Sequence, residues 1–175
     1  MLLIAVVGSK KSGKTTTIEA LVRGLTRRGY RVATIKHVAE KGFTLDTKGK
    51  DTWRHSQAGA NTVVAVASNE LGIIRKTDTT KLSLQEIVAN CQDNIDIVVL
   101  EGFRNLVKSD PMVLKIVTIN SLEEAVEASN QFRPIIAFAG VAAREAKYMD
   151  APSVDALKEP ERLVGIVEKN LRKLR

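Results

Sequence analysis

Residues 8–15 constrain the fold of this chain more than any other part of its sequence. They read GSKKSGKT and directly follow the apolar run of residues 2–7. This is the pattern G-x-x-x-x-G-K-[ST], in which a glycine-rich turn joins a buried strand to a helix. The backbone N–H groups of such a turn and the N-terminus of its helix together form a site for phosphate groups. A chance match in a chain of this length is on the order of 1%, given average glycine usage.

Each residue type in this loop has a chemical use. The glycines Gly8 and Gly13 allow backbone angles and close approaches that a side chain would block. The ammonium group of Lys14 can reach β- and γ-phosphate oxygens, and the hydroxyl of Thr15 can ligate Mg²⁺. We therefore predict a nucleotide-binding site formed by Gly8, Ser9, Lys10, Lys11, Ser12, Gly13, Lys14, Thr15 and Thr16. Lysines on loops usually face solvent, which is the simpler interpretation of Lys10 and Lys11.

Besides the loop, a P-loop protein is expected to carry an acidic residue at the end of a neighbouring strand, where its carboxylate can bind the metal ion. Glu101 directly follows the apolar run 97–100, and Gly102 permits a turn beside the phosphates. Asp96 begins the same strand and would lie about 15 Å away, given the rise of a strand per residue. We therefore predict that Glu101, rather than Asp96, ligates Mg²⁺ together with Thr15.

Asp46 is a catalytic candidate besides Lys14. It follows the second predicted strand, where loops often contact the γ-phosphate and its attacking water. Asp46 could hold the metal through water or orient the attacking water, although residues 46–49 also read as a simple turn. Asp51 is expected near the start of the next helix, where the helix dipole favours an acid.

The apolar pattern predicts an α/β protein with the three-layer P-loop fold, in which helices flank a mainly parallel sheet. Predicted strands cover residues 2–7, 31–36, 62–67, 71–76, 96–100, 113–119 and 135–139. Predicted helices cover residues 14–28, 49–58, 83–90, 121–128 and 160–174. Gly29 is expected to end the first of them, and Ser121, with Glu124 three residues on, to cap the helix 121–128. Strands 62–67 and 71–76 can form an antiparallel hairpin that turns at Ser68 and Asn69. The length of 175 residues predicts a single nucleotide-binding domain over residues 1–175.

Composition and charge exclude several other classes of protein. The net charge is +7, but the basic residues are scattered and are not interleaved with aromatic ones, so no nucleic-acid partner is expected. The apolar N-terminal run is too short for a signal peptide, and no stretch approaches about 18 apolar residues. We therefore expect a soluble, cytoplasmic protein without a membrane partner. The single cysteine, Cys91, excludes an internal disulfide and a four-thiolate metal site.

Further segments accompany the loop: residues 35–37 (IKH), 45–55 (LDTKGKDTWRH), 57–60 (QAGA) and 99–104 (VLEGFR). Together with the loop they resemble the MobB family, the family of molybdopterin-guanine dinucleotide biosynthesis protein B. The block 45–55 is more specific than the loop itself. The resemblance covers residues 1–104, and the remainder matches only as a plausible completion of the α/β fold. Residues 38–41 (VAEK) depart from the histidines and acid that the family tends to carry there.

The resemblance implies a GTP-binding protein with weak GTPase activity. Such a protein is an accessory to the guanylyltransferase MobA, which attaches GMP to molybdopterin, and it forms a homodimer. By position, the resemblance places residues 8–16 at the nucleotide phosphates, Thr15 and Glu101 at Mg²⁺, and Asp46 in a switch-like region. It leaves open the roles of Asp51, Trp53, Arg54 and His55.

Several of these side chains have an ordinary structural explanation as well as a functional one. Trp53 could stack on a pterin or a base, but it could also anchor its helix to the sheet. Arg54 and Arg104 could contact phosphate, but an ion pair with a carboxylate is the more common use of arginine. His37 and His55 are expected to form hydrogen bonds rather than a metal site.

Other classes of P-loop protein remain alternatives. An ATP-dependent small-molecule kinase would usually need an arginine-rich lid, and no such segment stands out. A nickel-chaperone GTPase needs cysteine and histidine ligands, which are nearly lacking. A partition ATPase carries lysine at the second loop position, where this chain has Ser9. There is no N-K-x-D guanine motif and no arginine finger in cis, so hydrolysis should be slow, and the residues alone leave GTP and ATP as alternatives.

Overall fold

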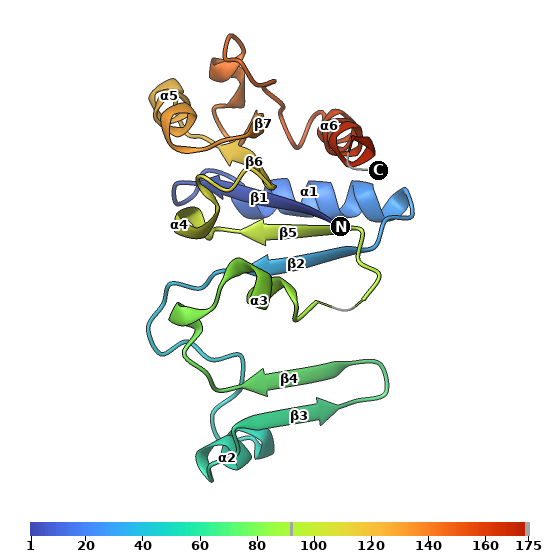
Figure 1. Ribbon diagram of the computed structural model, residues 1–175, viewed down its shortest axis with the longest axis vertical. Coiled ribbons are helices and arrows are strands. Elements are labelled where there is room, and N and C mark those ends of the chain that lie inside the picture. Colours follow the sequence, from blue (N-terminus) through green and yellow to red (C-terminus); the bar gives the residue numbers. More distant parts are fainter. Residues whose placement is uncertain (92, 174–175) are drawn as a thin grey trace. The chain divides into compact units, whose positions relative to one another are not determined.

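The computed structural model describes residues 1–91 and 93–173, and the chain divides into two compact units. Unit 1 comprises Met1–His37 and Leu84–Arg175, and unit 2 comprises Val38–Ser83. Figure 1 follows the chain through both units and shows that unit 2 is an insertion between two elements of unit 1.

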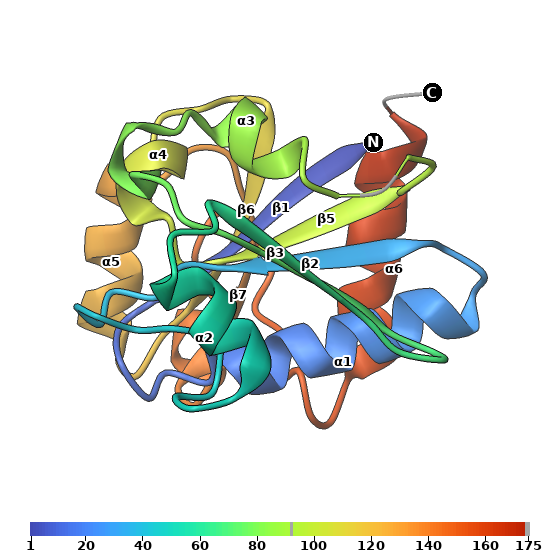
Figure 2. The same cartoon turned by 90° about the horizontal axis from the view of Figure 1, so that it is seen from below.

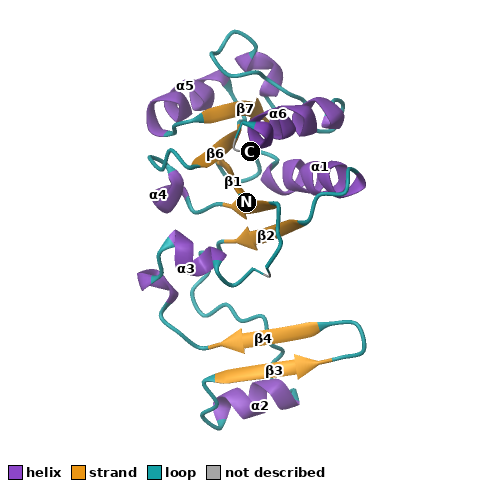
Figure 3. Ribbon diagram, turned by 45° about the vertical axis from the view of Figure 1, so that its right-hand side comes forward, coloured by secondary structure: helices purple, strands orange, loops and turns teal. Residues whose placement is uncertain are grey.

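A five-stranded parallel sheet forms the centre of unit 1 (Figure 3). The strands are β1 (Leu2–Gly8), β2 (Val32–Lys36), β5 (Ile97–Glu101), β6 (Val113–Thr118) and β7 (Ile135–Ala139). Their order in the sheet is β2-β5-β1-β6-β7, so β5 lies between the first two strands of the chain. Glu101 is consequently in register with both Val6 of β1 and Lys36 of β2. The carboxyl ends of β1, β2 and β5 therefore meet at one edge of the sheet.

Helices cover both faces of this sheet, as Figure 2 shows. One face carries α1 (Lys14–Arg27) and α6 (Pro160–Arg172), and the other carries α3 (Leu84–Val88), α4 (Arg104–Val107) and α5 (Leu122–Gln131). Because side chains alternate along a strand, Ile4 and Val6 pack with the first pair while Ala5 and Val7 pack with the other three. Burial on both faces explains the continuous apolar sequences of the strands and confirms the predicted three-layer α/β fold.

The ends of the long helices follow the signals in the sequence. At the end of α1, Gly29 has φ +83°, its N–H donates to Thr26 O at 3.0 Å, and Tyr30 N–H donates to Leu25 O at 3.2 Å. This is the Schellman arrangement that a glycine after a helix predicts. Helix α5 begins at the predicted cap Ser121, whose Oγ accepts from the backbone N–H of Glu124 at 3.4 Å.

The predicted helices differ from the structure mainly at their ends. The helix predicted at 83–90 covers only Leu84–Val88, and the one predicted at 121–128 continues to Gln131. The last helix was predicted to end at residue 174, which lies outside the described residues, and α6 ends at Arg172. The four-residue helix α4 was not predicted, because a segment this short shows no apolar period. None of the helices in residues 1–91 and 93–173 combines the length and the apolar character that crossing a lipid bilayer requires.

Unit 2 contains helix α2 (Asp51–Gln57) and the hairpin of β3 (Thr62–Val66) and β4 (Leu71–Arg75). The strands are antiparallel, as predicted, and Ala67 N–H donates to Glu70 O at 2.8 Å across the turn. Four apolar side chains, each more than half exposed, form two cross-strand pairs on one face of the hairpin: Val64 with Ile73, and Val66 with Leu71. These four residues are called the hairpin face below.

Candidate functional site

Residues 9–13 form the turn between β1 and α1, at the carboxyl edge of the unit 1 sheet. Gly8 lies directly against β6, because a Cβ atom there would overlap the side-chain and carbonyl oxygens of Thr118 and approach Ser12 Oγ to 2.7 Å. Gly13 caps α1 with φ +94°, a left-handed conformation that side chains disfavour. The two predicted glycines are thus required for different reasons, close packing at Gly8 and backbone conformation at Gly13.

Ser12 fastens the turn to the sheet. Its side chain is fully buried, and its Oγ lies 2.9 Å from Ser9 O and 2.6 Å from Thr118 Oγ1. Thr118 Oγ1 in turn lies 3.2 Å from Val7 O. The hydroxyl of Ser12 therefore holds the loop in shape, and Lys10 and Lys11 on the same loop are exposed.

Lys14 points back into the loop. Its Nζ donates to Gly8 O at 3.2 Å and to Ser9 O at 2.5 Å. Burial lowers the pKa of Lys14; the charge of Glu101 raises it, and the charges of Arg104 and Lys36 lower it further. The ammonium group therefore sits where an added anion would be stabilised, as expected for a phosphate site.

Thr15 and Glu101 meet at the adjoining strand end, where Thr15 Oγ1 donates to Glu101 Oε1 at 3.4 Å. A hydroxyl and a carboxylate are oxygen ligands of the kind Mg²⁺ takes beside phosphate groups, so this pair fits the ion. Asp96 lies at the other end of β5, where Arg31 N–H donates to its Oδ2 at 2.9 Å. The structure thus brings Glu101, and not Asp96, to Thr15.

A network that sequence analysis missed joins the loop to the region between β6 and α5. Ser9 Oγ donates to Glu124 Oε1 at 2.9 Å, and Asn120 Nδ2 donates to Ser9 Oγ at 2.8 Å. The backbone N–H of Asn120 donates to Glu124 Oε2, and this hydrogen bond is the main reason why the pKa of Glu124 is lowered. The sequence marked Glu124 only as part of a helix cap, since its contact with Ser9 depends on the adjacency of β1 and β6.

Arg104 contacts an aromatic ring and a side-chain amide instead of the carboxylate that was predicted as its partner. Its guanidinium lies 5.2 Å from the centre of the Phe132 ring, and it donates to Gln131 Oε1 at 3.1 Å. Within the described part of the chain no ion pair involves Arg104, so the predicted ion pair is wrong. Arg104 and Ser9 both line a pocket of about 90 Å³ between the loop and α5.

Asp46 belongs to unit 2. Its Oδ1 accepts from Thr47 N–H and from Thr52 Oγ1, both at 2.8 Å. Its Oδ2 is buried and has no hydrogen-bond partner among residues 1–91 and 93–173. A buried carboxylate oxygen without a donor is costly, which marks this atom as a candidate to bind water or a ligand. Asp51 begins α2, as predicted, and lies 3.8 Å from Arg54, which therefore has the ion pair expected of it.

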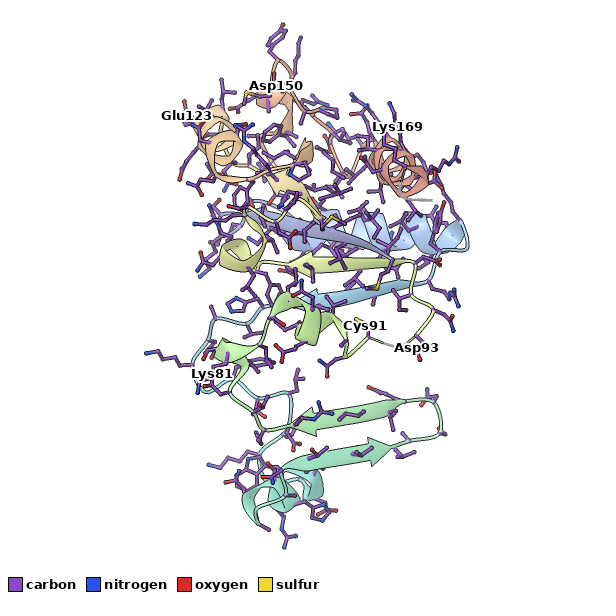
Figure 4. The ribbon with its side chains drawn as sticks, in the orientation of Figure 1. Lys81, Cys91, Asp93, Glu123, Asp150 and Lys169 are labelled. Atoms are coloured by element: carbon purple, nitrogen blue, oxygen red, sulfur yellow. The ribbon has the colours of Figure 1, made fainter. Side chains whose placement is uncertain are left out.

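Cys91 lies away from the loop, in the segment that joins α3 to β5 (Figure 4). It borders a largely apolar pocket of about 550 Å³, to which Met1, Leu3 and Ile95 contribute at the amino ends of the strands. Burial raises the pKa of the Cys91 thiol. The thiol is therefore mainly protonated at neutral pH, in a form that is a poor nucleophile and metal ligand.

Residues 3–140 match the family model described as MobB, molybdopterin guanine dinucleotide synthesis protein B. The molybdopterin-guanine dinucleotide biosynthesis adapter protein of Haemophilus influenzae is 34% identical over 103 residues, which cover 58% of this chain and 57% of that protein. The Escherichia coli adapter protein is 29% identical over 105 residues, which cover 59% of each. The chain thus spans somewhat more than half the length of these curated relatives.

Two solved structures share the whole fold. A crystal structure of molybdopterin-guanine biosynthesis protein B superposes with a TM-score of 0.71 at 26% identity, covering 98% of this chain and 99% of the other. Bacillus subtilis MobB superposes with a TM-score of 0.70 at 22% identity, covering 95% of this chain and 98% of the other. The second likeness supports the fold alone.

Proposed function

The chain belongs to the MobB family, and from that premise we propose that it is a GTP-binding adapter protein with slow GTPase activity in the synthesis of molybdopterin guanine dinucleotide. One observation carries the nucleotide part of this proposal. Lys14 and Thr15 directly follow the loop, Lys14 Nζ donates to the loop carbonyl Ser9 O, and Thr15 contacts Glu101 from the neighbouring strand. A cation, a hydroxyl and a carboxylate in this arrangement suit a triphosphate with its Mg²⁺.

The residues of the site would each bind a different part of the nucleotide or its metal ion. The N–H groups of the loop and of the first turn of α1 would donate to the β-phosphate, as they do at helix N-termini that follow glycine-rich turns. Lys14 would exchange two carbonyl partners for β- and γ-phosphate oxygens. Thr15 and Glu101 would hold Mg²⁺, which supplies charge neutralisation on the phosphate oxygens. Asp46 is our candidate to orient the attacking water, because the family resemblance places it in a switch-like region after the second strand.

The partners of Arg104 are consistent with slow GTP hydrolysis. Arg104, which lines the pocket beside Ser9, is engaged by Gln131 and Phe132. An arginine that stabilises the transferring phosphoryl group accelerates hydrolysis by several orders of magnitude, so a site without one is slow. A partner could complete the site, and we propose that it is a MobA-type guanylyltransferase, acting in the cytoplasm on molybdopterin intermediates.

The nucleotide preference tests the proposal directly. From the family resemblance we expect GTP to bind at least about tenfold more tightly than ATP in the presence of Mg²⁺, a difference of about 1.4 kcal/mol in binding free energy. Isothermal titration of both nucleotides, with and without EDTA, measures this. A clear preference for ATP would contradict the proposal and favour an ATP-dependent small-molecule kinase.

We also propose that the protein is a homodimer, and that the hairpin face of unit 2 is its contact surface. Both strands of the hairpin pair only with each other among the described residues, and four apolar side chains on one face are exposed. An isolated two-stranded hairpin is marginally stable in water, and an unpaired edge readily accepts another strand. A second copy of the same hairpin offers both a matching apolar face and a matching edge.

Placing lysine at Val64 and Ile73 together is expected to convert the dimer to a monomer. The two positions face each other across the strands, so the change puts like charges into the proposed contact and raises the dimer dissociation constant by about 100-fold. Light scattering after size exclusion measures the mass. Leu157→Lys, an exposed apolar position in unit 1, is the control and should stay dimeric. A wild-type protein that is monomeric at the same concentration would contradict this surface.

A further inference from the structure

An ion pair lies at the mouth of the candidate metal site. Lys36, the last residue of β2, is in register with Glu101, and its Nζ lies 3.2 Å from Glu101 Oε1. This is the same oxygen that accepts from Thr15 Oγ1 at 3.4 Å. The side chain of Lys36 is 60% exposed and that of Glu101 only 16%. The exposed ammonium group of Lys36 and the hydroxyl of Thr15 therefore share one oxygen of the largely buried Glu101 carboxylate.

We propose that Lys36 is a positioning residue of the metal site: it neutralises Glu101 while no metal is bound, and it yields this carboxylate to Mg²⁺ when metal and nucleotide bind. This inference deepens the proposed function and rests on it. The sequence alone predicted no role for Lys36, which was named only within the segment 35–37.

The charges around the loop explain why such a residue is needed. A bare carboxylate at Glu101, directly beside Thr15, would repel an incoming triphosphate before the metal arrives. The Lys36 ammonium cancels that repulsion. Its charge also reaches Lys14, since it is one of the causes that lower the pKa of Lys14. Lys36 thus belongs electrostatically to the phosphate site.

The exchange of partners needs only a side-chain movement. The backbone is fixed on both sides, because Lys36 pairs with Glu101 within the sheet and His37 N–H donates to Glu101 O at 3.0 Å. The four-carbon stem of lysine is flexible, and the Lys36 side of this ion pair is exposed to solvent, which weakens the attraction. Glu101 Oε1 could therefore exchange the Lys36 ammonium at small cost for a divalent ion that Thr15 would also hold.

This role predicts that removing the ammonium weakens the binding of GTP without metal but makes Mg²⁺ effective at a lower concentration. Without metal, GTP should bind more weakly to Lys36→Met, because Glu101 is no longer neutralised. In the presence of GTP, less Mg²⁺ should be needed for half-maximal enhancement of binding, because the metal no longer competes with the ammonium. A residue with a merely structural role would move both quantities in the same unfavourable direction.

The test is calorimetric titration of GTP in EDTA and across a series of MgCl₂ concentrations. For Lys36→Met we expect metal-free affinity to fall, and the half-maximal Mg²⁺ concentration to fall, each about threefold to fivefold. Lys36→Arg keeps the charge and should stay close to wild type. Arg31→Met is the matched control, because it removes one positive charge from an ion pair at the opposite end of the same two strands.

The outcomes separate this inference from the function on which it rests. The role of Lys36 is overturned, and the GTP-binding function stands, if wild type binds GTP but Lys36→Met changes neither quantity. The same follows if Lys36→Met lowers the metal-free affinity for GTP and raises the half-maximal Mg²⁺ concentration. The same holds if Arg31→Met reproduces both shifts, because the effect would then be one of net charge. If wild type binds no GTP in either buffer, the proposed function and this inference are overturned together.

Discussion

Replacing Lys14 with alanine is expected to weaken GTP binding about 100-fold, which corresponds to ~3 kcal/mol for hydrogen bonds to charged phosphate oxygens. Within residues 1–91 and 93–173, the hydrogen bonds of the Lys14 ammonium go to Gly8 O and Ser9 O. Its removal should therefore leave the fold intact while the ligand loses its main cation. Calorimetric titration of GTP with Mg²⁺ measures the affinity, and thermal unfolding followed by circular dichroism checks the fold.

Lys169→Ala is the control for this variant, since Lys169 is an exposed lysine of α6 (Figure 4). It should bind GTP as wild type does. Undiminished GTP binding by Lys14→Ala would contradict the proposed phosphate site.

The largest effect on stability is expected at Lys115. This lysine of β6 is fully buried, and its Nζ donates to Asp110 O and to Arg133 O, each at 2.5 Å. Lys115→Met would remove the Lys115 donor from Arg133 O and would leave Asp110 O with the Val113 N–H at 3.3 Å. The free energy of unfolding should therefore fall by about 2–4 kcal/mol. Chemical denaturation measures this. Lys108→Met, at an exposed lysine in the neighbouring turn, should change the free energy of unfolding little.

The contribution of Lys115 should also depend on pH. Burial lowers the pKa of Lys115 below its ordinary value of 10.5, although the charge of Asp110 partly opposes this. Between the folded pKa and the unfolded pKa, the unfolded chain binds more protons, so stability rises with pH. The difference in unfolding free energy between wild type and Lys115→Met should therefore be larger near pH 10 than at pH 7. A difference that shrinks as the pH rises would contradict this assignment.

The parts of the structure that the sequence predicted are those governed by neighbouring residues. The strand before Gly8, the helix after Gly13, the Schellman end at Gly29 and the cap at Ser121 each depend on a few consecutive residues. The placement of Glu101 at the end of its strand was predicted for the same reason. Local chemistry of this kind can be read from one sequence, because each residue type meets a specific backbone requirement.

The contacts that were missed join segments far apart in the chain. The interaction of Lys36 with Glu101 requires β2 to lie beside β5, and the interaction of Ser9 with Glu124 requires β1 to lie beside β6. Apolar periodicity identifies strands but not their order in a sheet. Lys115 was missed for a related reason, because its two carbonyl partners lie in turns whose proximity only the sheet defines.

The strand order of unit 1 has a consequence for synthesis on the ribosome. Strands β1 and β2 leave the exit tunnel before β5, the strand that finally separates them. Neither β1 nor β2 can therefore form its final strand pairing until β5 has been translated. The carboxylate of Glu101 and the hydroxyl of Thr118 arrive only with the later strands, so a nucleotide that needs them would stabilise the finished sheet and not its precursors.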